Sequence, residues 1–241
     1  MKALKIQQII YTAICLCVFS FLFTGCKKLV GLPLQENQDH IVTTLDPHIK
    51  MSAWDFLKSR ALGTSGFKDS IFYRMYQGIL YSGIDTNEYT KSGRTFIFLH
   101  NDAILRRSGN PATTQADSYF GKYKVNNAAA TKWEDYSMEQ VKNYLLSLIV
   151  QGEHSFENTY PDPKFEKTLL PLESDPLNPQ SLIAFRVIND RDSRFRINDF
   201  PGSAVPLPSS NPPGIQARTA GILSTNGPVH VVDRVLFFQR Q

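Results

Sequence analysis

The spacing of apolar residues changes near the middle of the chain, and this change limits the folds open to it. Before Gly152 the apolar residues recur mostly at helical spacing, whereas after it they gather in short runs rich in β-formers and separated by turn residues. Helices that come mostly first and strands that come mostly later predict an α+β domain. No internal repeat is visible in the sequence, and the length suits a single core.

The residue pattern in the first half of the domain predicts helices around one buried strand. Ser52 and Ser137 are placed to cap helices, and Gly83 and Gly152 are placed to end them. The expected helices cover residues 52–62, 67–82, 103–107 and 137–150, and the expected strand covers 95–99. Residues 108–135 follow no clear period.

The second half predicts short strands between turn-rich loops. The expected strands are 167–171, 182–189, 194–198, 216–222 and 229–238. Two connecting segments, 171–179 and 201–213, are rich in proline, which cannot donate a backbone hydrogen bond and is therefore excluded from central strands. These two segments are expected to be surface loops that offer area for contact with a partner.

The N-terminus has the three-part layout of an export signal, with a basic start, an uncharged apolar run and small residues before a cysteine. These parts are Lys2 and Lys5, residues 9–23, and Thr24-Gly25-Cys26. The apolar run is shorter than the roughly 20 residues that a membrane-spanning helix needs. The segment Phe23 to Cys26 resembles the bacterial lipobox, in which the cysteine is acylated after the preceding peptide is removed.

This resemblance implies a signal peptide over residues 1–25, a lipid anchor on Cys26 with a flexible tether over 26–49, and a folded domain over 50–241. Acyl chains of the palmitate type on Cys26 would make the membrane a partner. The implied location is the cell envelope, in the outer membrane of a Gram-negative bacterium. An ordinary signal peptide with an incidental cysteine is the alternative interpretation.

The cysteine count and the charge exclude several classes of function. Cys15 and Cys17 lie inside the apolar run, so a processed chain keeps only Cys26 and has neither an internal disulfide nor a cysteine metal site. Removing Lys2 and Lys5 lowers the formal charge of +4 by two, to 4 − 2 = +2. A charge this close to zero, without a basic stripe, argues against a nucleic-acid partner.

The segment from Ile222 to Leu236 carries a family resemblance. It contains an Asn226-Gly227 turn signal, followed by a β-rich run that holds His230 and Asp233. This pattern resembles the closing motif of the fasciclin domain. Weaker resemblances upstream are found in residues 54–57, 94–105 and 145–152.

The resemblance covers residues 50 to 238 and implies a single fasciclin-like domain, in which helices pack against a wedge-shaped β-sandwich. Animal members of the family carry a Tyr-His pair that is linked to receptor adhesion. In this sequence Ser147 and Leu148 stand at those positions, which puts that particular activity in doubt.

The four motif residues Asn226, Gly227, His230 and Asp233 are expected to be structural. His230 and Asp233 are three positions apart on a strand, so they point to opposite faces and form no catalytic pair there. We expect His230 to pack in the core with a backbone partner and Asp233 to accept hydrogen bonds from backbone amides. A hydrolase that uses His230 or His154 is the enzymatic alternative, but no motif for a nucleophile or a phosphate loop accompanies them.

The segment from Arg186 to Asp199 concentrates charge. Asp190 and Asp192 do not match a calcium loop, because Phe195 and Pro201 occupy the places of its glycine and glutamate. The cluster of Arg186, Arg191, Arg194 and Arg196 predicts either a site for acidic or hydroxyl-rich ligands or the solvated face of a hairpin with nearby aspartates. We therefore expect no metal and no cofactor.

Two functions remain open from the sequence. The first is a non-enzymatic adhesion or ligand-binding module that meets an extracellular protein or glycan. The second is an accessory glycan-binding lipoprotein of an outer-membrane nutrient-uptake system.

Overall fold

The computed structural model describes residues 46–64, 66, 68–188, 193–199 and 215–237. Several predictions therefore lie outside the described residues. These are the signal peptide, the lipid on Cys26, most of the tether, the charged turn with Asp190, Arg191 and Asp192, and the loop 201–213.

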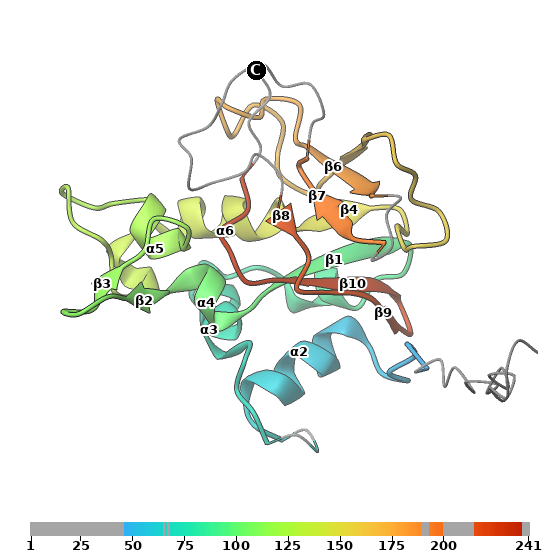
Figure 1. Cartoon of the computed structure of the whole chain (residues 1–241), viewed down its shortest axis with the longest axis horizontal. Coiled ribbons are helices and arrows are strands. Elements are labelled where there is room, and N and C mark those ends of the chain that lie inside the picture. Colours follow the sequence, from blue (N-terminus) through green and yellow to red (C-terminus); the bar gives the residue numbers. More distant parts are fainter. Residues whose placement is uncertain (1–45, 65, 67, 189–192, 200–214, 238–241) are drawn as a thin grey trace, which may run out of the picture. The chain divides into compact units, whose positions relative to one another are not determined.

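The first sheet has four strands, and its two central strands are the most buried. In the order of the sheet they are β4 (Ile149–Gln151), β1 (Arg94–Leu99), β10 (Gly227–Val232) and β9 (Thr219–Ser224). β1 and β10 run parallel, with Phe96 opposite Val229 and Leu99 opposite Val232. Both outer strands pair antiparallel with these two, so the centre of the sheet joins distant parts of the chain (Figure 1).

The second sheet is antiparallel throughout. Its strands, in order, are β5 (Lys164–Lys167), β6 (Leu182–Val187), β7 (Phe195–Ile197) and β8 (Ile215–Gln216). An isolated bridge between Val150 and Thr168 links it to β4 of the first sheet. Buried side chains of both sheets belong to one hydrophobic core, which places the two sheets against each other.

Helices complete the same core. They are α2 (Ala53–Ala61), α3 (Tyr73–Ser82), α4 (Asn101–Ile104), α5 (Tyr119–Lys122) and α6 (Met138–Leu146), with 3-10 turns η1 (Thr86–Tyr89) and η2 (Trp133–Asp135) and a small hairpin of β2 (Arg107–Ser108) and β3 (Thr113–Thr114). Ser52 and Ser137 cap α2 and α6 as predicted, and Gly83 ends α3 in the left-handed conformation at φ 67°. The predicted α+β class is confirmed.

The sequence misplaces the end of α6. The helix was expected to reach Val150, but it stops at Leu146 and the next residues form β4. Ile149 and Val150 are β-branched and pair with β1, which buries them completely. A single apolar run therefore contains both a helix end and a strand, and periodicity alone does not separate the two. Similarly, the helix expected at 103–107 is α4, capped by His100, and α3 begins only at Tyr73.

Three predicted strands also need correction. The strand expected at 167–171 is β5, which ends at Lys167, and the strand expected at 229–238 is β10, which ends at Val232. The strand expected at 216–222 is two strands in different sheets. The chain changes sheet at Ala217 and Arg218, whose amides donate to Phe195 O and Val231 O respectively.

The folded domain begins before residue 50. Ile49 N donates to Leu223 O at 3.0 Å, and Leu223 N donates to Pro47 O at 2.9 Å, so residues 47–49 pair with the outer edge of β9. The predicted tether is therefore shorter at its C-terminal end than expected. Among the described residues, no helix combines the length and apolar character needed to cross a bilayer.

Candidate functional site

Asn226 holds three separate segments together from the turn between β9 and β10. Its Oδ1 accepts from Ala53 N at 2.8 Å, at the start of α2. Its Nδ2 donates to Tyr89 O at 3.0 Å and to Lys91 O at 3.2 Å. The side chain is buried and its donors and acceptor are used within the protein, so the residue is committed to the fold.

Gly227 allows β10 to begin close against β1. Its φ of 147° is one that residues with a side chain rarely adopt, and a Cβ at this position would lie 1.9 Å from Arg94 O. Only glycine fits here. The second half of the Asn-Gly signal is thus a requirement of sheet packing as well as of the turn.

His230 lies between the two sheets and is completely buried. At a bulge in the β9–β10 ladder, Gly221 N donates to His230 Nδ1 at 3.2 Å. Nε2 therefore carries the proton and donates to His154 O at 2.8 Å, while the Phe195 ring stacks at 4.0 Å. Burial lowers the pKa of His230 to about 4, so the ring is neutral at physiological pH.

Asp233 lies beyond the end of β10 and is separated from the environment of His230. In place of the expected backbone amides, its carboxylate faces Arg106 at 3.5 Å and Arg218 at 3.7 Å. The other histidine of the enzymatic alternative, His154, has its Nε2 3.1 Å from Gln151 O. Within the described part of the chain, neither histidine ring is hydrogen-bonded to a hydroxyl that would act as a nucleophile.

Of the four arginines that cluster in the sequence, the structure places Arg186 and Arg196 side by side. Arg186 and Arg196 stand opposite each other on β6 and β7, and both approach Asp199, at 3.7 Å and 4.0 Å. Their side chains are mostly buried, so they do not form the solvated face that one interpretation expects. Arg191 lies outside the described residues. No group of three or more histidine, cysteine, aspartate or glutamate side chains is placed to hold a metal in the described ranges.

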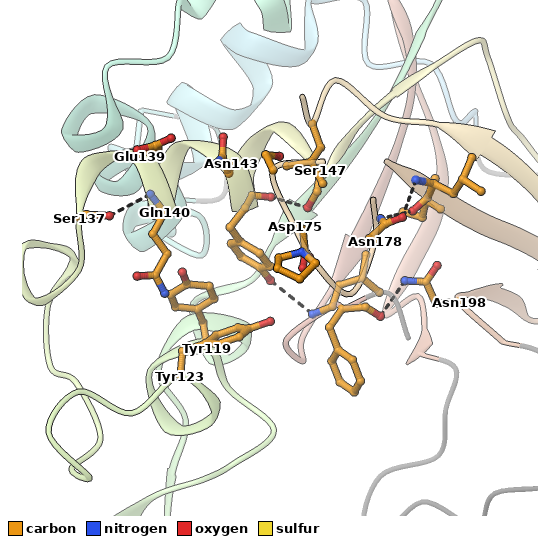
Figure 2. Close-up of a pocket in the computed structure, with 18 residues that line it drawn as sticks. Tyr119, Tyr123, Ser137, Glu139, Gln140, Asn143, Ser147, Asp175, Asn178 and Asn198 are labelled. Atoms are coloured by element: carbon orange, nitrogen blue, oxygen red, sulfur yellow. Dashed lines mark hydrogen bonds between the residues drawn. The ribbon is translucent and has the colours of Figure 1, made fainter. Parts of the chain in front are cut away.

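A cavity of about 410 Å³ opens between α6 and the loop that precedes β6 (Figure 2). We call it the α6 cavity. It is lined by side chains from α5, from α6, from the loop 170–182, and from residues 198, 236 and 237. Volumes of roughly 300–1,000 Å³ are usual for small-molecule sites. None of the four motif residues lines it.

One polar face of α6 forms the first wall. Gln140, Asn143, Tyr144 and Ser147 fall at i, i+3, i+4 and i+7, which places them on one side of the helix. The opposite side, with Val141 and Leu145, is buried in the core. Ser147, which follows the last residue of α6 as its C-cap, also lies on the cavity wall (Figure 2).

Tyrosine rings form the second wall. The Tyr119 ring packs 4.4 Å from Tyr144 and 4.7 Å from Tyr123, measured between ring centroids. Burial raises the pKa of Tyr123 to about 12 and raises the pKa values of Tyr119 and Tyr144 further. All three hydroxyls are therefore neutral at physiological pH and able to donate and accept hydrogen bonds.

The third wall is the loop before β6, which is fixed by its own hydrogen bonds. Asn178 Oδ1 accepts from Leu182 N at 2.9 Å, and Asn178 Nδ2 donates to Leu182 O at 2.7 Å. Ser181 Oγ donates to Pro171 O at 3.2 Å and closes the base of the loop. A proline-rich segment that the sequence assigns to the surface is therefore an ordered wall of the cavity.

The α6 cavity contains polar groups that form no hydrogen bond with a described residue. Neither the Asn143 amide nor the Tyr123 hydroxyl forms a hydrogen bond with a described residue. Asp175 accepts from Leu177 N through Oδ1, which leaves Oδ2 for another partner. These groups and the ring faces make the cavity suited to binding a small polar molecule.

Sequence reasoning missed this site, although its signals were present. The polar residues of α6 recur at helical spacing on the face away from Val141 and Leu145, and the helix is followed by a proline-rich loop. What the sequence did not show was that α5, in the unassigned region 108–135, would bring Tyr119 and Tyr123 to the same place.

No protein-family model matches the chain, and no curated protein matches it. Among solved structures, the chain is similar to a FAS1 domain pair from the insect cell adhesion molecule fasciclin I, with a TM-score of 0.45 and 12% sequence identity. The match covers 78% of this chain and 51% of that one, so the chain spans about half the length of this neighbour.

Proposed function

We propose that the chain is a lipid-anchored, non-enzymatic adhesion or ligand-binding module of the cell envelope, built on a fasciclin-like domain. The observation that carries this proposal is the α6 cavity, which is lined by tyrosine faces and by an Asn143 amide that forms no hydrogen bond with a described residue. The Asn143 amide and the Tyr123 hydroxyl are partly exposed at the cavity, so a ligand there can replace water as their hydrogen-bonding partner.

The absence of a catalytic role rests on the chemistry of the cavity walls. Its tyrosines have raised pKa values and remain protonated, so they do not act as bases near neutral pH. The histidine in the motif is buried away from the cavity and is held by His154 O and Gly221 N. A catalytic set needs a nucleophile, a base and an orienting group in mutual reach, and the cavity lining does not bring such a set together.

The proposed location of the protein at the cell envelope is inferred from the N-terminal sequence. The apolar run and the lipobox-like segment at Cys26 support export and acylation, and two or more acyl chains are needed for stable anchoring. Residues 47–49 pair with β9, so the chain joins the domain at the edge of the first sheet.

Attachment of intact cells tests the proposal. Cells that produce the full chain are compared with cells that produce the Cys26→Ser variant, on surfaces coated with arrayed glycans or with extracellular proteins. We expect wild-type cells to be labelled by an antibody to the domain and retained on at least one surface. The variant should lose retention, because its chain is no longer held at the membrane. If wild-type cells bearing the chain are retained on no surface, the proposal fails.

The nutrient-uptake alternative is favoured by the same cavity, because its amide, carboxylate and tyrosine lining suits a glycan. Deleting the gene and measuring growth on a polysaccharide as the sole carbon source separates the two. A growth defect on that polysaccharide, with normal attachment, supports uptake. Normal growth with lost attachment supports adhesion.

A further inference from the structure

We infer that the α6 cavity binds a saccharide, meaning an uncharged ring that carries several hydroxyls. This inference rests on the proposed function, because it names the class of ligand that the binding module takes. Three properties of the cavity lead to it, namely the flat ring faces, the mixed hydrogen-bonding groups and the balance of charge.

The first property is the set of flat tyrosine faces that line the cavity. Tyr119, Tyr123 and Tyr144 pack against one another with interplanar angles of 41° and 49°, which fixes their positions in a rigid wall. Tyr123 and Tyr144 are only partly buried and line the cavity. A tyrosine offers an apolar face and a polar tip on one side chain, which matches a molecule with an apolar C–H face and a polar rim.

The second property is the mixture of hydrogen-bond donors and acceptors in the cavity wall. The Asn143 amide both donates and accepts, and a neutral Tyr123 hydroxyl does the same. Asp175 Oδ2 accepts only. A hydroxyl can satisfy all three groups because it is itself a donor and an acceptor. A ligand with several hydroxyls therefore pairs these groups without leaving one unsatisfied on either side.

The third property is the charge of the residues that line the cavity. Glu139 and Asp175 are the charged residues among the side chains that line the cavity, and they disfavour an anionic ligand. A cationic ligand meets another obstacle. The Lys122 ammonium lies 3.6 Å from the centroid of the Phe237 ring, which also lines the cavity, so a cation already occupies that aromatic face. An uncharged ligand avoids the repulsion from the two carboxylates and does not compete with Lys122 for the Phe237 ring.

Titration calorimetry on the purified full chain in detergent micelles tests the inference. The probes are glucose, galactose, mannose and N-acetylglucosamine with their short oligosaccharides, glucuronate as an anion, and choline as a cation. We expect at least one neutral saccharide to bind and glucuronate and choline to bind more weakly. Saturation-transfer NMR on the same samples should show the saccharide C–H protons in contact with the protein.

Two substitutions locate the site. Asn143→Ala should weaken saccharide binding about tenfold, which is the usual effect of losing a hydrogen-bonding partner. Tyr123→Phe keeps the ring and removes the hydroxyl, so it should weaken binding about fivefold. The matched controls are Lys142→Ala, on the exposed side of the same helix, and Tyr160→Phe, on an exposed tyrosine that does not line the cavity. Both controls should bind as the wild type does.

The outcomes separate this inference from the proposed function. Retention of cells on protein-coated surfaces without binding of any neutral saccharide would overturn the inference and leave the proposed function standing. Preferential binding of choline or glucuronate would overturn the saccharide class. Saccharide binding that neither cavity substitution weakens would place the site elsewhere and also overturn the inference.

Discussion

The β9–β10 turn and the α6 cavity use similar side chains in opposite ways. In the turn, the Asn226 amide forms hydrogen bonds with Ala53 N, Tyr89 O and Lys91 O, all within the protein. On the cavity wall, the Asn143 amide forms no hydrogen bond with a described residue. The first amide ties three segments of the fold together, whereas the second is free for a ligand.

This difference shows why a recognisable motif need not mark the functional site. Asn226 and Gly227 are constrained by close backbone contacts, and those contacts depend on the fold and not on any ligand. On the wall of the α6 cavity, the Asn143 side chain is partly exposed and forms no hydrogen bond with a described residue, so the fold constrains it far less. Substitutions at Gly227, Asn226 and Asn143 and the acid sensitivity of His230 test this contrast.

Gly227→Ala should have the largest effect on stability. The new Cβ would stand 1.9 Å from Arg94 O, in the backbone of the neighbouring strand. Because backbone cannot move aside without opening the centre of the sheet, we expect a loss of more than about 4 kcal/mol in the free energy of unfolding, measured by urea denaturation. Gly93→Ala is the control, because Gly93 has a positive φ but no atom within 4 Å of the added Cβ. It should cost only about 1 kcal/mol. Equal losses for the two variants would refute the close-contact explanation.

Asn226→Ala should cost about 3 kcal/mol, since it removes hydrogen bonds to three backbone groups, two of them buried, that are worth about 1 kcal/mol each. Thermal unfolding followed by circular dichroism measures the change. Asn226→Asp keeps the acceptor for Ala53 N but cannot donate to Tyr89 O and Lys91 O, so it should also be destabilised. A variant at this position that melts like the wild type would show that these contacts do not hold the segments together.

His230 should make the folded state sensitive to acid. Its pKa is lowered to about 4 in the folded state, against an ordinary value of 6.5, so the unfolded chain binds the proton more readily. Stability is therefore fully present above pH 6.5 and falls as the pH drops toward 4. By pH 5 the loss due to His230 should be about 2 kcal/mol.

Urea unfolding between pH 7.5 and 5 measures this slope, and NMR of the folded protein should show that the His230 ring is still mostly neutral at pH 5. His100 also has a pKa that burial lowers, so it adds to the slope in the same direction. The His230→Gln variant separates the two contributions, because its slope should be shallower than that of the wild type. An unchanged slope would show that His230 is not the titrating group.

Asn143→Ala should leave stability almost unchanged, within about 0.7 kcal/mol, because the side chain forms no hydrogen bond with a described residue and alanine favours a helix. Differential scanning calorimetry of the two proteins without saccharide provides the measurement. A large loss would mean that this amide supports the fold, and the contrast with Asn226 would disappear.

Sequence reasoning recovered the features that depend on local chemistry. The caps at Ser52 and Ser137, the left-handed end at Gly83 and the buried strand near residue 96 each follow from a few neighbouring residues. The α+β class follows from the change in periodicity. These features are predictable because the deciding interactions lie within one turn or one strand.

The features that sequence reasoning missed depend on distant partners. Ile149 and Val150 form a strand only because β1 lies beside them, and Ala217 and Arg218 change sheet only because Phe195 and Val231 accept their hydrogen bonds. The α6 cavity joins α5, α6 and a loop that are separated by up to about sixty residues, so no single window of sequence contains it. In the region 108–135, the helix α5 has only four residues, too short for a periodic signal.

The pairing of β1 with β10 has a consequence for how the chain reaches its native state. The middle of the first sheet needs a strand that begins at Gly227, so a partly synthesised chain has β1 without its parallel neighbour. Contacts between such distant segments form slowly, because the long intervening loop must close first. Formation of the native first sheet is therefore postponed until the C-terminal strand is available.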